Sequence, residues 1–161
     1  MFKPRKMGNT YFYKGGMAMK VSDIMTKNVI KIHPDESAEV AARTLTHYNI
    51  GALPVCTDDG KLCGVVTDRD LVIRCMAANM PASQTKVRQL MTGQVISVQP
   101  DMDASVAAHL MGRQQVRRLP VVENGKLCGM VSLGDMACRD DSIMDAADAL
   151  SDITSNIRTD G

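Results

Sequence analysis

Two stretches of this chain repeat each other: VSDIMTKNVIKIHPDESAEVAARTLTHYNIGALPV (residues 21–55) and VRQLMTGQVISVQPDMDASVAAHLMGRQQVRRLPV (residues 87–121). Met-Thr, Pro-Asp and Leu-Pro-Val keep a constant offset of 66 residues between the copies. Further along, Gly-Lys-Leu-Cys-Gly occurs at 60–64 and again at 125–129, with an offset of 65. Chance does not keep so many short matches in one order, so the sequence predicts a duplicated structural unit.

Each copy begins with the pattern of a strand followed by a helix. The apolar runs 29–32 and 95–98 stop just before a proline, which is typical of a short strand. Ser37 in the first copy, and Asp103 or Ser105 in the second, can then cap a helix. The apolar residues that follow recur at helical spacing: Val40, Ala41, Leu45 and Tyr48, then Val106, Ala107, Leu110 and Met111.

A hairpin and a second helix complete each copy. Strands are expected at 52–56 and 61–67 in the first copy, and at 119–122 and 126–132 in the second. Asp, Asn and Gly between these strands are turn residues that tolerate positive φ. The second helices are expected to begin at Asp68 and Leu133.

One such unit is too small to bury its own sheet, so two copies are expected to pack sheet to sheet. The predicted fold is α+β, with two β-α-β-β-α repeats related by a pseudo-twofold axis. We divide the chain into an N-terminal extension (1–19), a first repeat (20–77), a linker (78–86), a second repeat (87–139) and a C-terminal helix and tail (140–161). The last helix, expected at 141–157, carries an apolar stripe that would cover the core or meet a partner: Ile143, Ala147, Leu150 and Ile157.

Composition narrows the function classes. The 161 residues are 45% hydrophobic and 23% charged, which is ordinary for a globular protein. A net charge of +1 and only 3% aromatic residues give no footprint for nucleic acid or an anionic membrane. No apolar run approaches the length of a membrane span, and no secretory signal is evident at the N-terminus. The five cysteines lack disulfide-framework spacing, so we expect reduced thiols in the cytoplasm.

The strand-to-helix junctions GVVTDRD (64–70) and GMVSLGD (129–135) are the most informative segments for function. Thr67 and Ser132 are placed as helix N-caps, with Asp70 and Asp135 three residues later. Such a pair is often only a cap. A helix start also favours phosphate, and an ionised carboxylate can accept two hydrogen bonds from a ribose diol. The two junctions are therefore compatible with capping alone or with a ribose-phosphate ligand.

On these motifs the chain resembles a tandem pair of CBS domains, the nucleotide-sensing Bateman module, of the stand-alone bacterial type. The resemblance spans about residues 20–139 and rests on Met-Thr, Pro-Asp, Leu-Pro-Val and the two Gly-x-Val-Thr/Ser-x-x-Asp junctions. It implies two clefts, no catalysis, and no required cofactor. The ligands it implies are AMP, ADP, ATP, S-adenosylmethionine or NAD.

The resemblance also implies roles for single residues. Asp70 and Asp135 would bind ribose hydroxyls, and Thr67 and Ser132 would bind ribose or phosphate. The other cleft residues would be Ile30, Ala52 and Pro54 in the first copy, and Ile96, Arg118 and Pro120 in the second.

The two copies differ in charge where a phosphate would lie. Arg117 and Arg118 stand where the first copy has Gly51 and Ala52, and Arg69 lies near the start of the first copy's second helix. Because arginine matches phosphate geometry, we expect phosphates nearer Arg117 or Arg118, only one of which should point into a cleft. The alternative is a solvated basic edge.

Four function classes can be compared. The leading one is a regulatory module that binds an adenosine ligand and signals through a homodimer or an unidentified protein partner. The second is a ligand-free dimerising scaffold or stress protein. The third is a thiol or metal sensor using Cys63 and Cys128, although a single cysteine per strand is weak evidence for a metal. An enzyme is the least expected, because no nucleophile–base pair can be assembled.

Overall fold

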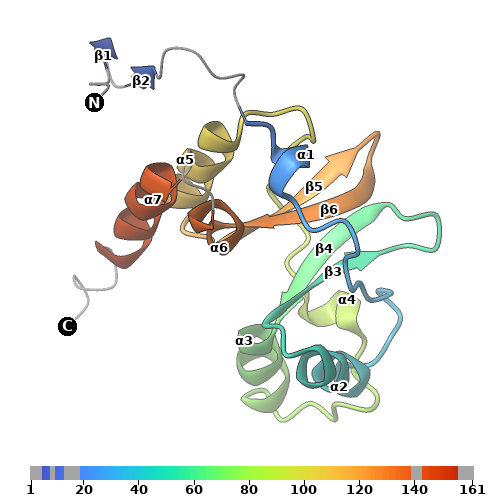
Figure 1. The fold of residues 1–161 in the computed structure, drawn as a ribbon. Coiled ribbons are helices and arrows are strands. Elements are labelled where there is room, and N and C mark those ends of the chain that lie inside the picture. The colour runs from blue at the N-terminus through green and yellow to red at the C-terminus, as the bar shows by residue number, and fades with distance from the viewer. Residues whose placement is uncertain (1–4, 8–9, 13–18, 139–142, 156–161) are drawn as a thin grey trace.

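The computed structural model describes residues 5–7, 10–12, 19–138 and 143–155 (Figure 1). Its elements are, in chain order, β1 (Arg5–Met7), β2 (Thr10–Phe12), α1 (Val21–Ile24), α2 (Ala38–Tyr48), β3 (Ala52–Cys56), β4 (Leu62–Thr67), α3 (Asp68–Asp70), the π-helical segment η1 (Leu71–Met76), α4 (Val87–Leu90), α5 (Ala104–Gln114), β5 (Arg118–Glu123), β6 (Lys126–Ser132), α6 (Leu133–Ala137) and α7 (Ile143–Ser155). None of the described helices is both long and apolar enough to cross a membrane.

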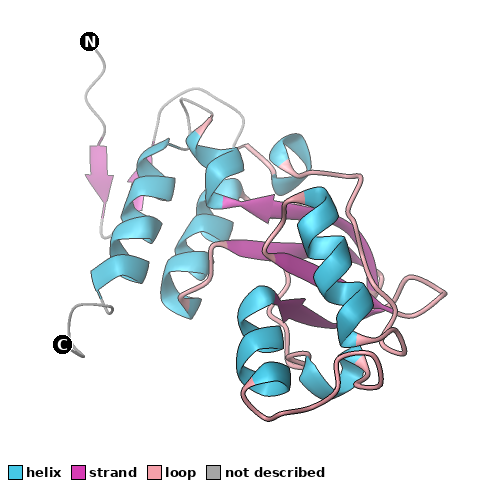
Figure 2. Cartoon of the chain, turned by 90° about the horizontal axis from the view of Figure 1, so that it is seen from below, coloured by secondary structure: helices cyan, strands magenta, loops and turns pink. Residues whose placement is uncertain are grey.

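The predicted α+β fold of two repeats is confirmed. β3 pairs with β4 and β5 pairs with β6, each as an antiparallel hairpin, and β1 pairs with β2 near the N-terminus. The hairpin turns need positive φ, which Gly60 (84°), Asn124 (51°) and Gly125 (79°) supply. The hairpins β3–β4 and β5–β6 lie in the middle of the molecule, and the helices lie around them (Figure 2).

The strands expected at 29–32 and 95–98 do not form. Each run contributes one parallel bridge instead, Ile32 with Val55 and Val98 with Val121. Ile32 donates its N–H to the Pro54 carbonyl and accepts from the N–H of Cys56. Shortly before each bridge the backbone is hydrogen-bonded to the other repeat. The chain therefore cannot pair as a strand along the hairpin of its own repeat.

That attachment is an exchange between the repeats. The helix α1, at the start of the first repeat, lies on the second repeat, where Val21 donates its N–H to the Met102 carbonyl (2.8 Å). A little further on, Thr26 and Met130 exchange two backbone hydrogen bonds of 2.8 and 2.9 Å. The side chains of Val21 and Ile24 consequently belong to the core of the second repeat.

The matching segment of the second repeat lies on the first. Val87 donates its N–H to the Glu36 carbonyl (2.8 Å), and Thr92 and Val65 exchange two backbone hydrogen bonds. Val87 and Leu90 belong to the core of the first repeat. Each repeat therefore completes its core with an N-terminal segment from the other, so neither core is complete without both copies.

The hairpin tips of the two repeats also meet. Leu62 donates its N–H to the Gly125 carbonyl (3.3 Å), and Leu127 donates to the Gly60 carbonyl (3.0 Å). These symmetric bonds join the starts of β4 and β6 to each other's turns. The helices α2 and α3 lie at one end of the molecule, and α5, α6 and α7 lie at the other (Figure 1).

The long helices begin where the sequence predicts. The hydroxyl of Ser37 accepts from the Val40 N–H (3.2 Å), and of the two candidates in the second repeat Asp103 is the cap, accepting from the Ser105 N–H (2.8 Å). The apolar faces are narrower than expected. Of the apolar residues that recur at helical spacing, the structure leaves Val40, Tyr48 and Val106 exposed.

The C-terminal helix α7 packs on α5 and α6, but not through the predicted stripe. Its buried residues are Ala146, Ala149 and Ile153. Ile143 and Leu150 are 47% and 43% exposed, and Ile157 lies outside the described residues. The stripe does not cover the core, because small residues control the contact: a Cβ placed on Gly112 of α5 would lie 3.2 Å from the Ala149 Cα.

A first prediction concerns the exchange. A Cβ at Gly64 would lie 2.7 Å from the Thr92 carbonyl oxygen and 2.8 Å from the Met91 sulfur. We expect Gly64→Ala to lower the free energy of unfolding by about 1–3 kcal/mol, measured by urea denaturation, because the exchanged segment must shift. The matched control is Gly93→Ala, where the nearest atom is 3.9 Å away. Equal stabilities of the two variants would contradict the exchange.

A second prediction concerns the charge on α7. Burial raises the pKa of Asp145; His109 opposes this effect, and Asp103 and Asp148 add to it. Folding stability from this group is therefore complete below the unfolded pKa of about 3.9, and is lost as the pH rises through the higher folded value. We expect Asp145→Asn to raise Tm at pH 7 and the gain to shrink toward pH 4. A gain that does not depend on pH would contradict this cause.

Candidate functional site

The junction between β4 and α3 is a closed hydrogen-bonded unit. The Asp70 carboxylate accepts at Oδ2 from the Thr67 backbone N–H (2.9 Å) and from the Thr67 hydroxyl (2.8 Å). The Asp70 N–H donates back to the Thr67 hydroxyl oxygen (3.1 Å). The other carboxylate oxygen, Oδ1, lies 3.5 Å from the Arg74 guanidinium. Capping thus uses one oxygen of Asp70, and an ion pair uses the other.

The junction between β6 and α6 repeats the unit with serine in place of threonine. Ser132 donates to Asp135 Oδ2 through its backbone N–H (2.8 Å) and its hydroxyl (2.7 Å), and the Asp135 N–H donates to the Ser132 hydroxyl oxygen (3.1 Å). Within the described residues, Asp135 Oδ1 has no partner. This oxygen can accept a hydrogen bond from a ligand without breaking the cap.

A cavity of about 460 Å³ opens beside the second junction. β5, β6, α6 and α7 surround it together with the residue before β5. It is lined by Arg117, Arg118, Ser132, Leu133, Gly134, Ala137, Ile143, Ala146, Ala147 and Leu150. One side therefore carries two cations and a hydroxyl, and the α7 side is wholly apolar. A volume of this size is in the range of small-molecule sites.

Arg117 and Arg118 are both among the residues that line this cavity. Arg117 precedes β5, so strand alternation begins only at Arg118. Arg118 pairs directly with Ser132 across the hairpin, and the Arg117 carbonyl accepts from the Leu133 N–H (3.1 Å). Neither guanidinium makes an ion pair within the part of the chain that the structure describes, so both charges are available to an anion.

The first repeat carries a carboxylate at the corresponding place, next to the cation Arg69. Gly51 and Ala52 replace the arginines, and Asp68 replaces Leu133. The Asp68 carboxylate lies over the start of α3, where Oδ1 accepts from the Arg69 N–H (2.7 Å) and Oδ2 lies 3.5 Å from a Cβ placed on Gly51. A carboxylate therefore occupies the position where the second repeat offers two cations.

The remaining predicted cleft residues are spread more widely. Ala52 pairs with Thr67 across the first hairpin, and Ile30 is half-buried against the first core. Ile96 is 38% exposed. Pro54 and Pro120 are buried, and their carbonyls accept the backbone bonds from Ile32 and Val98. None of these five residues lines the cavity of the second repeat.

Sequence reasoning missed several residues of the cavity. Leu133, Gly134 and Ala137 could have been found, because the offset of 65 sets them opposite Asp68, Arg69 and Val72. The α7 residues could not, because the first repeat has no counterpart of α7 and the duplication gives no guide there.

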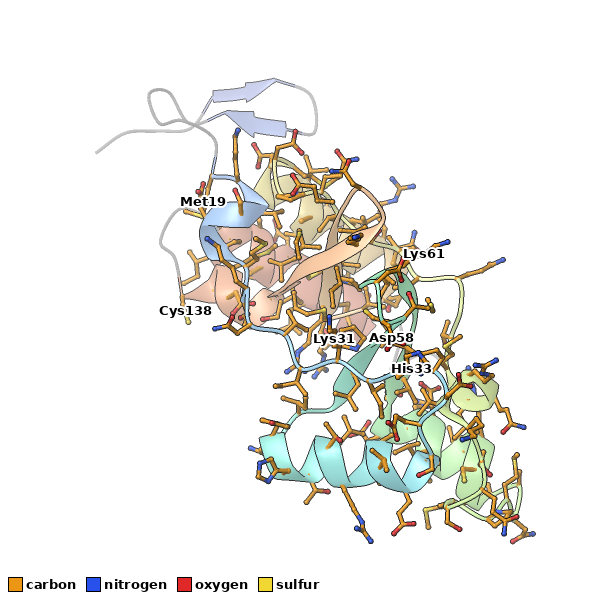
Figure 3. The ribbon with its side chains drawn as sticks, turned by 90° about the vertical axis from the view of Figure 1, so that its right-hand side faces the viewer. Met19, Lys31, His33, Asp58, Lys61 and Cys138 are labelled. Carbon is orange, nitrogen blue, oxygen red and sulfur yellow. The ribbon has the colours of Figure 1, made fainter. Side chains whose placement is uncertain are left out.

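The thiol and metal hypothesis gains little from the geometry. Burial raises the pKa of Cys56 and of Cys128, which makes these thiols less reactive. Among the described residues, no three His, Cys, Asp or Glu side chains are grouped as a metal site. His33 lies beside Asp58, with 3.8 Å between Nε2 and the carboxylate (Figure 3), but that aspartate is fully exposed.

Comparison with known proteins identifies the family. The model of the CBS domain family matches residues 21–76 and 87–138. The chain belongs to the CBS domain family. The CBS domain-containing protein YhcV of Bacillus subtilis is 37% identical over 134 residues, covering 83% of this chain and 94% of that protein. A relative of this length has little room for any domain beyond the CBS pair.

Two solved CBS structures share the fold. The crystal structure of Hypoxic Response Protein I with two coordinated zinc ions is 32% identical, with a TM-score of 0.70, and covers 75% of this chain and 98% of that one. The CBS domain pair of protein MJ0100, in complex with 5′-methylthioadenosine and S-adenosyl-L-methionine, is 28% identical with a TM-score of 0.67, covering 76% and 95%. At least one related CBS pair therefore binds adenosyl ligands.

The capping geometry of the CBS junctions predicts a stability effect. Asp70→Ala and Asp135→Ala each remove a carboxylate that accepts two hydrogen bonds. We expect each to lower the free energy of unfolding by about 1–2 kcal/mol in urea titrations. Asp101→Ala, at an exposed carboxylate, is the control. Full stability of both cap variants would show that the caps are dispensable.

Proposed function

We propose that this protein is a non-catalytic regulatory module of the cytoplasm that binds an adenosine ligand in the clefts of its CBS pair. The single observation that carries the proposal is the cavity of the second repeat. There Ser132 and two arginines that make no ion pair within the described residues line one space of ligand size, and the Asp135 carboxylate is bound to Ser132 at its edge. No cofactor is required for this role.

The ligand's polar groups can be matched to these residues. The ribose hydroxyls donate to Asp135 Oδ1 and meet the Ser132 hydroxyl, which keeps the cap intact. A phosphate is held by Arg117 and Arg118, whose planar guanidinium groups suit phosphate oxygens. The ligand of this cleft is therefore an adenosine phosphate, with AMP, ADP and ATP as the candidates.

The first cleft is expected to select differently. The Asp68 carboxylate beside Gly51 repels a phosphate, so the ligand there is an adenosyl compound without one. Binding of 5′-methylthioadenosine and S-adenosyl-L-methionine by the MJ0100 CBS pair supports ligands of this kind. The signal passes through a homodimer or another protein partner.

Calorimetry with AMP and adenosine tests the phosphate assignment. Arg118→Ala is expected to weaken AMP binding about tenfold or more, because a charge-assisted hydrogen bond contributes roughly 1.5–3 kcal/mol. Adenosine binding should change little. The control is Arg113→Ala, which removes an exposed arginine on α5 that does not line the cavity. Equal losses for AMP and adenosine would mean that Arg118 does not contact phosphate.

Asp135→Asn tests the ribose assignment while keeping an acceptor for the cap. We expect it to weaken AMP and adenosine alike, since both carry the ribose diol, with a small change in Tm. Unchanged affinity for both ligands would contradict the ribose role of Asp135. The absence of AMP binding to the unaltered chain would overturn the adenosine phosphate proposal as a whole.

A further inference from the structure

The C-terminal helix α7 forms one wall of the second-repeat cavity. Four of its residues, Ile143, Ala146, Ala147 and Leu150, line the cavity opposite the arginines and Ser132. This wall is entirely apolar, so it cannot compete with a ligand for the polar groups on the other side. A ligand that fills the cavity from Ser132 outward must touch α7.

The first repeat shows that α7 is an addition to a unit that folds without it. Ala108 and Gly112 of α5 are buried, whereas their counterparts on α2, Ala42 and Thr46, are exposed. A hollow of about 500 Å³ lies over that part of α2, lined by Ala42, Arg43, Thr46 and His47. Figure 1 shows α7 against α5 and α6, and no such helix on α2. The hairpin and helices of a repeat thus form with this face open.

The attachment of α7 combines tight packing with an unfavourable charge. Ala149 and Ile153 are buried, and the Gln115 side chain donates to the Asp152 carbonyl (3.1 Å). Against this, Asp145 is partly desolvated near Asp103 and Asp148. Ile143 and Leu150, at the cavity, remain 47% and 43% exposed. These two apolar side chains lose exposure only when something occupies the cavity, so an occupant adds to the docking of α7.

We propose that the ligand of the second CBS cavity contacts α7 through Ile143, Ala147 and Leu150, so that cavity occupancy strengthens the docking of α7 onto α5 and α6. This inference rests on the proposed function for its ligand. The coupling follows from linkage: a ligand that binds only the docked arrangement shifts the docking equilibrium toward it, and docking raises the affinity by the same factor. Without the ligand, release of α7 uncovers the face of α5 around Ala108 and Gly112.

Hydrogen–deuterium exchange on the full chain tests the coupling, with AMP as the probe. AMP at about 100 times its dissociation constant is expected to slow amide exchange in residues 143–155 by up to about a hundredfold. Exchange in α2, whose face around Ala42 and Thr46 is exposed, should be unaffected. Calorimetry then compares Leu150→Asn with Met144→Asn; Met144 is exposed on the same helix but does not line the cavity. We expect Leu150→Asn to weaken AMP about three- to tenfold, and Met144→Asn to leave it unchanged.

A second variant, Ala149→Arg, should undock α7 and weaken AMP without touching the cavity lining. The outcomes separate the two proposals. In the first outcome, Asp135→Asn weakens AMP binding, but AMP does not slow exchange in α7, and Leu150→Asn and Ala149→Arg leave the affinity unchanged. This outcome overturns the role of α7 and leaves the proposed function standing. AMP that does not bind the unaltered chain overturns the proposed function, and with it the ligand to which α7 would respond.

Discussion

The structure depends on the exchange of N-terminal segments between the two CBS repeats. Each Met-Thr segment crosses to the other copy, pairs with its return strand, and fills its core. The contact is so close that a Cβ on Gly129 would lie 2.6 Å from the Met25 sulfur. This explains why Gly-Lys-Leu-Cys-Gly and Met-Thr occur together in both copies. The second glycine of Gly-Lys-Leu-Cys-Gly in one copy leaves room for the Met-Thr segment of the other copy.

The exchange also places the two strand-to-helix junctions in equivalent surroundings, where they have since diverged. Both junctions keep the same capping unit, down to distances that agree within 0.1 Å. The charged residues around them differ, with Asp68 and Arg69 in one repeat and Arg117 and Arg118 in the other. The two repeats thus share one scaffold and differ in the charged residues around it.

The local rules of the sequence predicted most of the fold. Turn residues located both hairpins, capping residues (Ser37, and Asp103 or Ser105) located the helix starts, and the internal offset predicted a duplicated unit. The first strands were wrong because a tertiary contact with the other repeat removes residues 26–31 from their own sheet. The α7 stripe does not cover the core, because the small residue Ala149 permits close packing on Gly112, which a count of apolar residues does not detect.

The site was predictable only as far as the duplication reached. Ser132, Arg117 and Arg118 come from positions that the alignment of the two copies singles out, and they meet in one cavity. The apolar wall comes from α7, which has no counterpart to align.

A crystal structure of the full chain grown with AMP tests the account most directly. The account predicts AMP between Ser132 and α7, with its phosphate on Arg117 or Arg118; AMP bound beside Asp68 instead, or only outside the cavity, would contradict it.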